Sequence, residues 1–493
     1  MASGTETKTE TEAWETVVGL EVHCELSTAS KLFCACANEF GSEPNTNVCP
    51  VCLGLPGSLP VLNERAVEFA LRVAEALDLD VPDRSVFARK NYFYPDMPKD
   101  YQTSQYDKPI TVNGHLDVDG DRIGITRAHL EEDTGKTLHI GGGGRINDAE
   151  YSLVDYNRAG VPLLEIVSEP DIRSAEQAKR YVEELRATLF AIGVSDVKME
   201  EGSLRIDANV SVRPAGSPEF GTRCEIKNLN SLRSLVKAIE HEARRQVTAR
   251  EFGDDLAQET RHWDEARGRT ISGRSKEEAH DYRYFPEPDL VPVAPTDEMR
   301  ASVRATLPEL PAARRARLVA DWDIKPDDAN VLVNVPGLVD YTASAIAATK
   351  SGTPKDIVNW VRQDVLAYLN DASGLSPSVL TPEMLAELVD LVADGTISRP
   401  QGKDVLDESL REEKWPRDIV EARGIAQVSD EDAIAEIVDE VMAANADVVD
   451  EFRAGDEKTK KQKQGFLFGQ VKRALDGDAN PQIITKLLAD RLS

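Results

Sequence analysis

Four cysteines in one short segment have the spacing of a metal site. The segment FCACANEFGSEPNTNVCPVC holds a C-x-C pair, Cys34 and Cys36, and a C-x-x-C pair, Cys49 and Cys52, with twelve residues between them. Such pairs are typical of tetrahedral zinc. Four thiolates fill the ion's coordination sphere and leave no place for a catalytic water, so the spacing predicts a structural Zn²⁺ site. Four free core cysteines are the alternative, although cores rarely need two close pairs beside Gly, Pro and Asn.

Acidic residues and one histidine, from three segments, could hold a second ion. In TVVGLEVHCEL, strand alternation puts Glu21 and His23 on the face opposite the apolar residues. Glu165 lies inside the apolar run 163–167 and needs either a basic partner or a cation. The segment ITRAHLEEDTGK ends in the acids Glu131, Glu132 and Asp133. This set suits a hard ion such as Mg²⁺, whereas solvated sheet faces and exposed acids are the simpler alternative.

Two further patterns could bind phosphates or bases. The segment ARKNYFYPDMPKDYQTSQYD interleaves Lys90 with Tyr92 and Tyr94, and basic groups beside aromatic rings serve phosphates and unstacked bases. A rigid loop packed by its own aromatic side chains is the alternative. The strand-like segment SLRIDANVSVR carries Asp207 and Asn209 on its polar face, which is either the floor of an active site or a solvated surface.

A sheet and several helices must position these residues. Up to about residue 292, alternating segments mix with helices that we predict after Asn63, from Ser174 to Gly193, and over about 230–253. Proline then becomes frequent and the remaining segments are helical, including one with Thr381 as its cap. A softer break follows at about 415–430. The pattern predicts the α+β class with more than one domain.

The composition narrows the class of protein. The 493 residues carry a formal charge of -29, with acids spread along the whole chain, which suggests a halophilic protein that stays soluble in concentrated salt. The polar N-terminus and the lack of a long apolar run predict a cytoplasmic protein without a membrane partner, in which the six cysteines form no disulfides. No phosphate-loop motif or dinucleotide-binding motif occurs, so any nucleotide must be held in another way.

Long motifs resemble those of one family. VGLEVHCEL, PNTNVCPVCLGLPGSLPVLN, RKNYFYPDMPKDYQTSQYD, HLEEDTGK, SLVDYNRAGVPLLEIVSEPDIRS and DYRYFPEPDL are similar to segments of the GatB family, one component of the aspartyl/glutamyl-tRNA amidotransferase GatCAB. The resemblance covers Val17 to about Pro292 almost continuously, and GFLFGQVKRALDGDANPQ resembles the family's tail.

The resemblance implies a function and an architecture. Such proteins use ATP and Mg²⁺ to phosphorylate the side-chain carboxylate of misacylated Asp-tRNA(Asn) or Glu-tRNA(Gln). Ammonia from glutamine hydrolysed in the GatA component then displaces the phosphate, and GatC holds GatA and GatB together in a heterotrimer. The implied domains are a disordered N-terminus (1–14), a catalytic antiparallel-sheet cradle (15–292) with a zinc knuckle (34–52), a helical domain (293–415) and a YqeY-like tRNA-binding tail (416–493). No DNA partner is implied.

The resemblance also gives the candidate residues roles. The Mg²⁺ ligands are expected to be His23, Glu132 and Glu165, with Glu21 beside them, and His23, Glu132, Glu165 and Lys90 form the expected catalytic set. Lys90 is expected to contact phosphate, with Tyr92 and Tyr94 near the nucleotide or the acceptor end. The same pocket is expected to be lined by Asp155, Asn157, Arg158, Asp207 and Asn209. The basic segment KTKKQKQ, 458–464, is either an RNA contact or a solvated helix face.

Two other functions compete with this one. A zinc-stabilised tRNA-binding scaffold without catalytic activity would keep the cysteines and the tail, but would have no use for a buried Glu165. An ATP-dependent ligase that acts on a free amino acid would keep the ion site. Whether Asp-tRNA, Glu-tRNA or both are substrates stays open at this point.

The acidic composition leads to a first prediction. Because neighbouring carboxylates repel one another until salt screens them, the melting temperature should rise as KCl increases from dilute buffer to about 1 M. Thermal melting of the purified protein against KCl concentration measures this. Equal stability in dilute buffer would contradict a halophilic protein.

Overall fold

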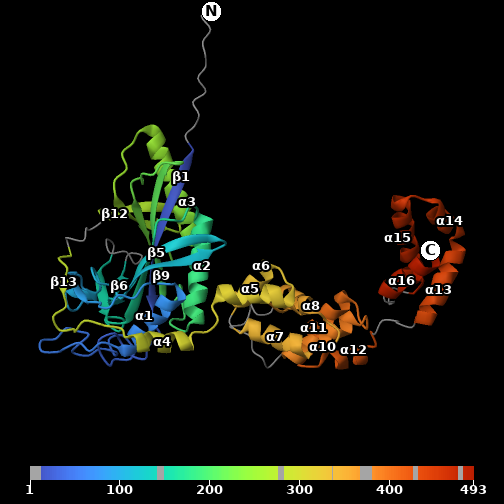
Figure 1. The fold of residues 1–493 in the computed structure, drawn as a ribbon, viewed down its shortest axis with the longest axis horizontal. Helices are drawn as coiled ribbons and strands as arrows, with labels where there is room; N and C mark the ends of the chain where they lie inside the picture. Colours follow the sequence, from blue (N-terminus) through green and yellow to red (C-terminus); the bar gives the residue numbers. More distant parts are fainter. Residues whose placement is uncertain are drawn as a thin grey trace, which may run out of the picture. The chain divides into compact units, whose positions relative to one another are not determined.

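The computed structural model describes residues 13–141, 149–275, 282–335, 337–366, 380–425, 431–475 and 481–492. It divides into two compact units, residues 1–311 and 312–493. Residues 1–12 of the N-terminus that we predicted to be disordered lie outside the described residues, and Trp14 is the first residue of strand β1. Figure 1 gives the order of the elements along the chain.

The first unit is built on an eight-stranded sheet with the order β12-β11-β10-β9-β1-β8-β5-β4. Its pairs are antiparallel except for β10 and β11. Two smaller sheets, β13-β2-β3 and β6-β7, accompany it. The strands are β1 (Trp14–Glu25), β2 (Ala88–Asn91), β3 (Tyr101–Ser104), β4 (Thr111–Val118), β5 (Asp121–Glu132), β6 (Lys136–Ile140), β7 (Tyr151–Asp155), β8 (Pro162–Ser168), β9 (Leu204–Pro214), β10 (Cys224–Lys227), β11 (Glu259–Asp264), β12 (Arg269–Ser275) and β13 (Phe285–Pro286).

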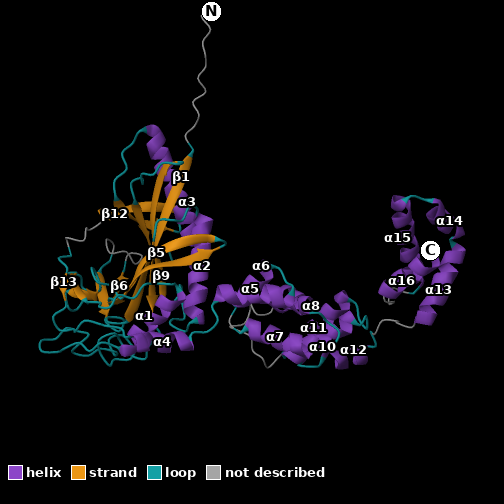
Figure 2. Ribbon diagram, viewed as in Figure 1, coloured by secondary structure: helices purple, strands orange, loops and turns teal. Residues whose placement is uncertain are grey.

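Alternation along the strands gives the large sheet one apolar face and one polar face. On β1, Val18, Leu20 and Val22 are buried in a core that also contains residues of the helices α1 (Glu64–Ala76), α2 (Ala175–Ala191) and α3 (Leu232–Phe252). Figure 2 shows how helices and strands are arranged in this unit. The polar residues of β1 are therefore on the face away from these helices.

The start and stop signals of the predicted helices are confirmed. The side chains of Asn63 and Ser174 accept backbone N–H groups at the N-termini of α1 and α2. Helix α3 ends at Gly253, which has the left-handed conformation that favours glycine. Thr381 caps α10 (Pro382–Ala393) in the second unit.

The second unit is helical throughout its described residues and has two separate cores. One contains residues from Leu318 to Val420, with Ile425 packed against it, and the other runs from Ile434 to Leu492. The remaining helices of the chain are α4 (Asp297–Thr306), α5 (Pro311–Trp322), α6 (Pro326–Asn334), α7 (Leu338–Ala348), α8 (Pro354–Trp360), the π-helical turn η2 (Val361–Val365), α11 (Arg399–Glu412), α12 (Pro416–Arg423), α13 (Glu431–Ala444), α14 (Ala446–Ala454), α15 (Glu457–Ala474) and α16 (Pro481–Leu492).

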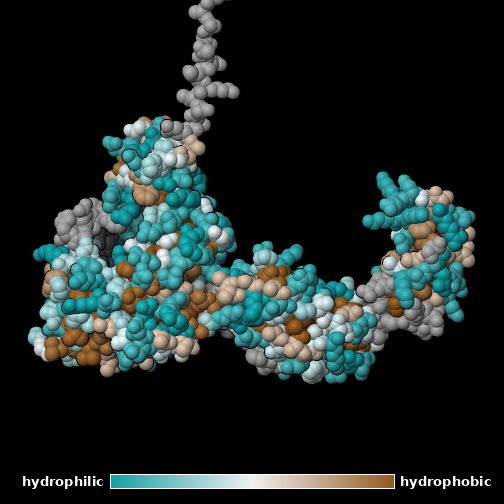
Figure 3. All heavy atoms as spheres, viewed as in Figure 1, coloured by the Kyte–Doolittle hydropathy of each residue, from teal (hydrophilic) through white to brown (hydrophobic). Residues whose placement is uncertain are grey.

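These elements confirm the predicted α+β class, while the predicted domain limits at residues 292 and 415 stay predictions. Among the described residues, no single helix is long and apolar enough to cross a membrane; the bent pair α6 and α7 passes that test by length and composition only. Hydrophilic residues cover most of the surface visible in Figure 3, as the acidic composition leads one to expect.

A buried carboxylate attaches α3 to the edge of the sheet and gives a prediction. Glu242 is fully buried and accepts hydrogen bonds from Arg245 at 2.7 Å, Gln246 at 2.8 Å and Thr270 at 3.0 Å. Because Glu242→Gln leaves the guanidinium of Arg245 without a carboxylate, it should cost about 3 kcal/mol or more in the free energy of unfolding. Calorimetry of the full chain should show a transition at least roughly 6 °C lower.

The pH dependence and a control sharpen this prediction. Although burial opposes ionisation, the hydrogen bonds and the charge of Arg245 lower the pKa of Glu242. This stabilisation is therefore present above the ordinary carboxyl pKa of 4.5 and is lost as the pH falls below it, so the difference between the two proteins should shrink in acid. Glu240→Gln, exposed on the same helix, should change the free energy by less than about 0.5 kcal/mol. An equally small effect at Glu242 would contradict the account.

Candidate active site

Two carboxylates and two imidazoles meet at the centre of the sheet's polar face. The register pairs His23 of β1 with Glu165 of β8, and Glu165 with His129 of β5. Nε2 of His23 lies 3.5 Å from Glu165 and 3.7 Å from Glu131. Nε2 of His129 lies 3.5 Å from Glu165 and 3.9 Å from Glu131. Ligand atoms of His23, Glu131 and Glu165 lie within 4.8 Å of one another, which is close enough for one metal ion.

The ionisation of the group follows from its burial. Burial opposes the charged form of His23, but its hydrogen bond to Glu165 and the charges of Glu165 and Glu131 raise its pKa to about 9. Burial and the charge of Glu165 raise the pKa of Glu131 to about 7. Burial also lowers the pKa of His129 to about 4, so this imidazole is neutral near pH 7. Protons on His23 and Glu131 thus supply positive charge that a divalent cation would otherwise supply.

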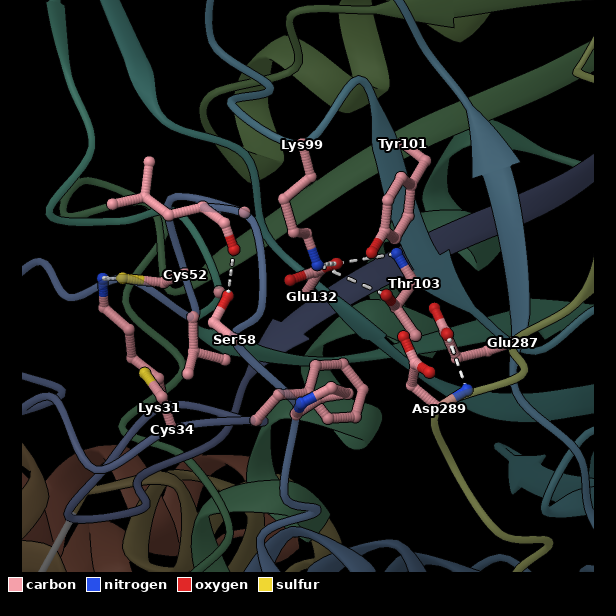
Figure 4. A pocket seen from close by; sticks show the side chains of 16 residues that line it. Lys31, Cys34, Cys52, Ser58, Lys99, Tyr101, Thr103, Glu132, Glu287 and Asp289 are labelled. Carbon is pink, nitrogen blue, oxygen red and sulfur yellow. Dashed lines mark hydrogen bonds and ion pairs between the residues drawn. The ribbon is translucent and has the colours of Figure 1, made fainter.

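Glu132 lies in a different place from the one we predicted. Neighbouring residues on a strand point to opposite faces, so Glu131 and not Glu132 joins His23 and Glu165. The carboxylate of Glu132 is buried, pairs with the ammonium of Lys99 and accepts the backbone N–H of Thr103 at 2.7 Å. Figure 4 shows this pair in a pocket whose wall also contains Lys31, Cys34 and Cys52.

Glu21 also stands apart from His23. It forms a second acidic group with Asp207 and Glu225, whose ligand atoms lie within 4.8 Å of one another. Lys227 already neutralises part of this group, because its ammonium lies 2.6 Å from Asp207 and 3.4 Å from Glu225. The amide of Asn209 donates a hydrogen bond to Glu21 at 2.9 Å. The predicted pocket residues Asp207 and Asn209 thus lie beside Glu21.

The predicted phosphate and base contacts lie beside the carboxylate cluster. The ammonium of Lys90, on β2, is 4.7 Å from the ring centre of Tyr282, and its charge acts on Glu131, Glu165 and His129. The rings of Tyr92 and Tyr94 stack with their centres 4.6 Å apart. The sequence therefore located a cationic and aromatic segment, and the structure brings its Lys90 close to the cluster.

Asp155, Asn157 and Arg158 contact other parts of the chain. The backbone N–H groups of Asn45 and Asn47 donate to the side chains of Asp155 and Asn157 at 2.9 and 2.8 Å, so both acceptors hold the loop that carries the cysteines. Arg158 donates to the carbonyls of Thr134 and Gly135 at 3.0 and 2.9 Å. All three predicted residues line a second cavity of about 530 Å³.

The four cysteines converge as their spacing predicted. The sulfurs of Cys34, Cys36, Cys49 and Cys52 lie within 4.8 Å of one another, and no disulfide joins them. This donor set fits a metal such as zinc. Glycine, proline and asparagine around the cysteines allow the tight turns that bring the two pairs together.

His129 is a site residue that the sequence reasoning missed. It contacts both carboxylates of the cluster, and its Nδ1 lies 3.4 Å from Nε of Arg127. A signal was present, because His129 precedes Glu131 by two residues and must share its face if the segment is a strand. The adjacent acids drew attention to the end of the strand instead.

Comparisons with known proteins agree with this site. Residues 16–301 match the family described as "GatB/GatE catalytic domain", and residues 340–492 match the one described as "GatB domain". Over 485 residues, the chain is 52% identical to the B component of the aspartyl/glutamyl-tRNA(Asn/Gln) amidotransferase of Moorella thermoacetica, which spans 97% of this chain and 100% of that protein. Proteins of the same name from Carboxydothermus hydrogenoformans and Frankia casuarinae are 50% and 51% identical, covering 97% of this chain and 99% and 96% of their own lengths. The chain therefore belongs to the GatB family.

Proposed function

We propose that this chain is the transamidating component of a tRNA-dependent amidotransferase. Its substrates are tRNAs that carry aspartate or glutamate in place of asparagine or glutamine, and its partners are the glutaminase GatA and the smaller GatC. The family membership and the names of the relatives support the reaction class. The single observation that carries the proposal is the buried cluster of His23, Glu131 and Glu165, for which a scaffold protein would have no use.

The reaction has two steps. The γ-phosphoryl group of ATP moves to a side-chain carboxylate oxygen of the aminoacyl group, which gives an acyl phosphate and ADP. Ammonia then attacks the acyl carbon, a C–N bond forms, the C–O bond to phosphate breaks, and inorganic phosphate and a proton leave. The first step brings several negative oxygens together, so it needs positive charge at a fixed place.

The cluster residues fit a divalent cation. Two carboxylates and one imidazole would hold it, and the protonation of His23 and Glu131 in the ion-free protein agrees with a missing positive charge. A bound Mg²⁺ supplies charge neutralisation for the phosphates. His129 contacts both carboxylates and keeps them oriented, while the ammonium of Lys90 offers a second positive charge for phosphate.

Other residues are assigned to the substrate side. Tyr92 and Tyr94 present a stacked aromatic pair for the nucleotide or the acceptor end of the tRNA. Glu132 stays a proposed catalytic residue, but beside Lys99 in the adjacent pocket and not as a cation ligand. The lysines of α15, within residues 458–464, are the proposed contacts of the tail with the tRNA backbone. The four-cysteine site supports the fold and takes no part in the chemistry.

The placement of two neighbouring acids gives a prediction. Glu131→Gln removes one charged oxygen ligand, so the affinity for Mn²⁺ used as a probe ion should fall about 10-fold or more, and ADP formation should be lost. Glu132→Gln should leave Mn²⁺ affinity within about threefold, because its carboxylate faces Lys99. Electron paramagnetic resonance of free Mn²⁺ measures the affinity in the complex with GatA and GatC. The reverse ranking would restore Glu132 as the ligand.

The complete reaction tests the function itself. With GatA, GatC, glutamine, ATP and Mg²⁺ present, the complex should form amide on Asp-tRNA(Asn), Glu-tRNA(Gln) or both, and should release ADP in step with it. Free aspartate and free glutamate should give no amide. Glu165→Gln should bind tRNA with unchanged affinity but form no ADP, since the charged ligand is lost and the tail is intact. Turnover by Glu165→Gln, or by free amino acids, would contradict the proposal.

A further inference from the structure

One lysine is fully buried beside the four-cysteine site. The side chain of Lys31 has no exposed surface, and its Nζ lies 2.7 Å from the carbonyl oxygen of Asn47, 3.3 Å from that of Tyr156 and 3.8 Å from Sγ of Cys52. In Figure 4 the side chain of Lys31 extends to the sulfur of Cys52, at the opposite side of the pocket from Lys99. Three acceptors thus surround one ammonium group.

A buried ammonium group needs an anion nearby. The two carbonyl oxygens are neutral, and within the described ranges no ion pair of 4.0 Å or less joins Lys31 to a carboxylate. Lys99, in the same pocket, differs because it pairs with Glu132. The group beside Lys31 that can carry a negative charge is the sulfur of Cys52.

The donor set supplies that charge when a metal is bound. Four thiolates around a divalent ion leave a net charge of -2, since four negative charges meet two positive ones. In a low-dielectric site this excess charge is costly unless a cation lies close to the sulfurs. The ammonium of Lys31 is in the position to compensate for it, and the sulfur in turn makes the burial of the ammonium tolerable.

We propose that Lys31 is the charge-compensating and positioning residue of the four-cysteine metal site. Its ammonium donates a hydrogen bond to Sγ of Cys52 and offsets part of the negative charge of the metal–thiolate group. The same nitrogen donates to the carbonyls of Asn47 and Tyr156, which fixes the cysteine loop to the turn between β7 and β8. This role does not depend on the proposed reaction, because it concerns metal affinity alone.

Metal affinity in the full-length chain tests the proposal. Lys31→Met removes the charge and the donor but keeps the length of the side chain, and Lys31→Gln keeps a donor without charge. Zn²⁺ affinity, measured by competition with a chromophoric chelator, should fall about 10- to 100-fold in Lys31→Met and less in Lys31→Gln. Lys99→Met is the matched control, a lysine of the same pocket with a carboxylate partner, and should stay within about threefold of the unmodified chain.

Cobalt supplies a second readout that is independent of activity. In Co²⁺-loaded Lys31→Met, the thiolate-to-cobalt absorption band should shift to lower energy, because the sulfur of Cys52 loses its hydrogen bond and becomes a stronger electron donor. The ligand-field bands of four-thiolate coordination should remain. If Lys31→Met does not fold, the same comparison is made with Lys31→Gln.

Three results would overturn the proposal. One is an unchanged Zn²⁺ affinity in Lys31→Met, or in Lys31→Gln when that variant replaces it. Another is an equal loss in Lys99→Met, which would mean that the total charge of the pocket sets the affinity and not the contact with Cys52. The last is a chain that binds neither Zn²⁺ nor Co²⁺ at the cysteines.

Discussion

Two buried carboxylates, Glu131 and Glu165, set the requirement that organises the catalytic unit. Both contact the imidazoles of His23 and His129, and neither is stable as a charged group in this position without a nearby proton or cation. Three strands hold them there. Because the opposite face of these strands is fully buried in the apolar core, a shift of one residue in register would move the whole polar set into that core.

The arrangement separates the chemistry of the site from the support of its walls. The carboxylate cluster lies on regular strands, whose backbone hydrogen bonds keep it in place. The cysteine loop lies beside it and has no regular structure, so it depends on the four sulfurs and on side chains from elsewhere. Asp155 and Asn157 accept backbone N–H groups of this loop, and the ammonium of Lys31 contacts both the loop and the turn between β7 and β8. A metal at the cysteines would therefore stabilise the wall of the pocket that contains Lys99 and Glu132.

Much of this could be predicted from the sequence, because the signals were local. Caps and glycine terminators located α1, α2 and α3, and cysteine spacing located the four-sulfur site. Alternation placed His23 on a polar strand face, and the apolar residues around Glu165 showed that this acid needs a partner. These inferences needed only the period of a strand or a helix and the cost of burying a charge.

The rest depended on long-range pairing that no local pattern encodes. Glu131 and Glu132 are chemically identical neighbours, and only the register of β5 against β8 decides which faces His23. Glu21 and His23 share a face, yet two residues along a strand span about 6.6 Å, so they join different groups. The partners of Asp155 and Asn157 lie more than a hundred residues away in the chain, and nothing in either segment identifies the other.

The location of the cation is the most direct test of the central claim. A crystal of the complex soaked in Mn²⁺ and measured at the manganese absorption edge gives an anomalous difference map that identifies the ion without assumptions about its ligands. The account predicts a peak within about 2.5 Å of Nε2 of His23 and of a carboxylate oxygen of both Glu131 and Glu165. A peak among Glu21, Asp207 and Glu225, or beside Glu132, with none at His23, would contradict it.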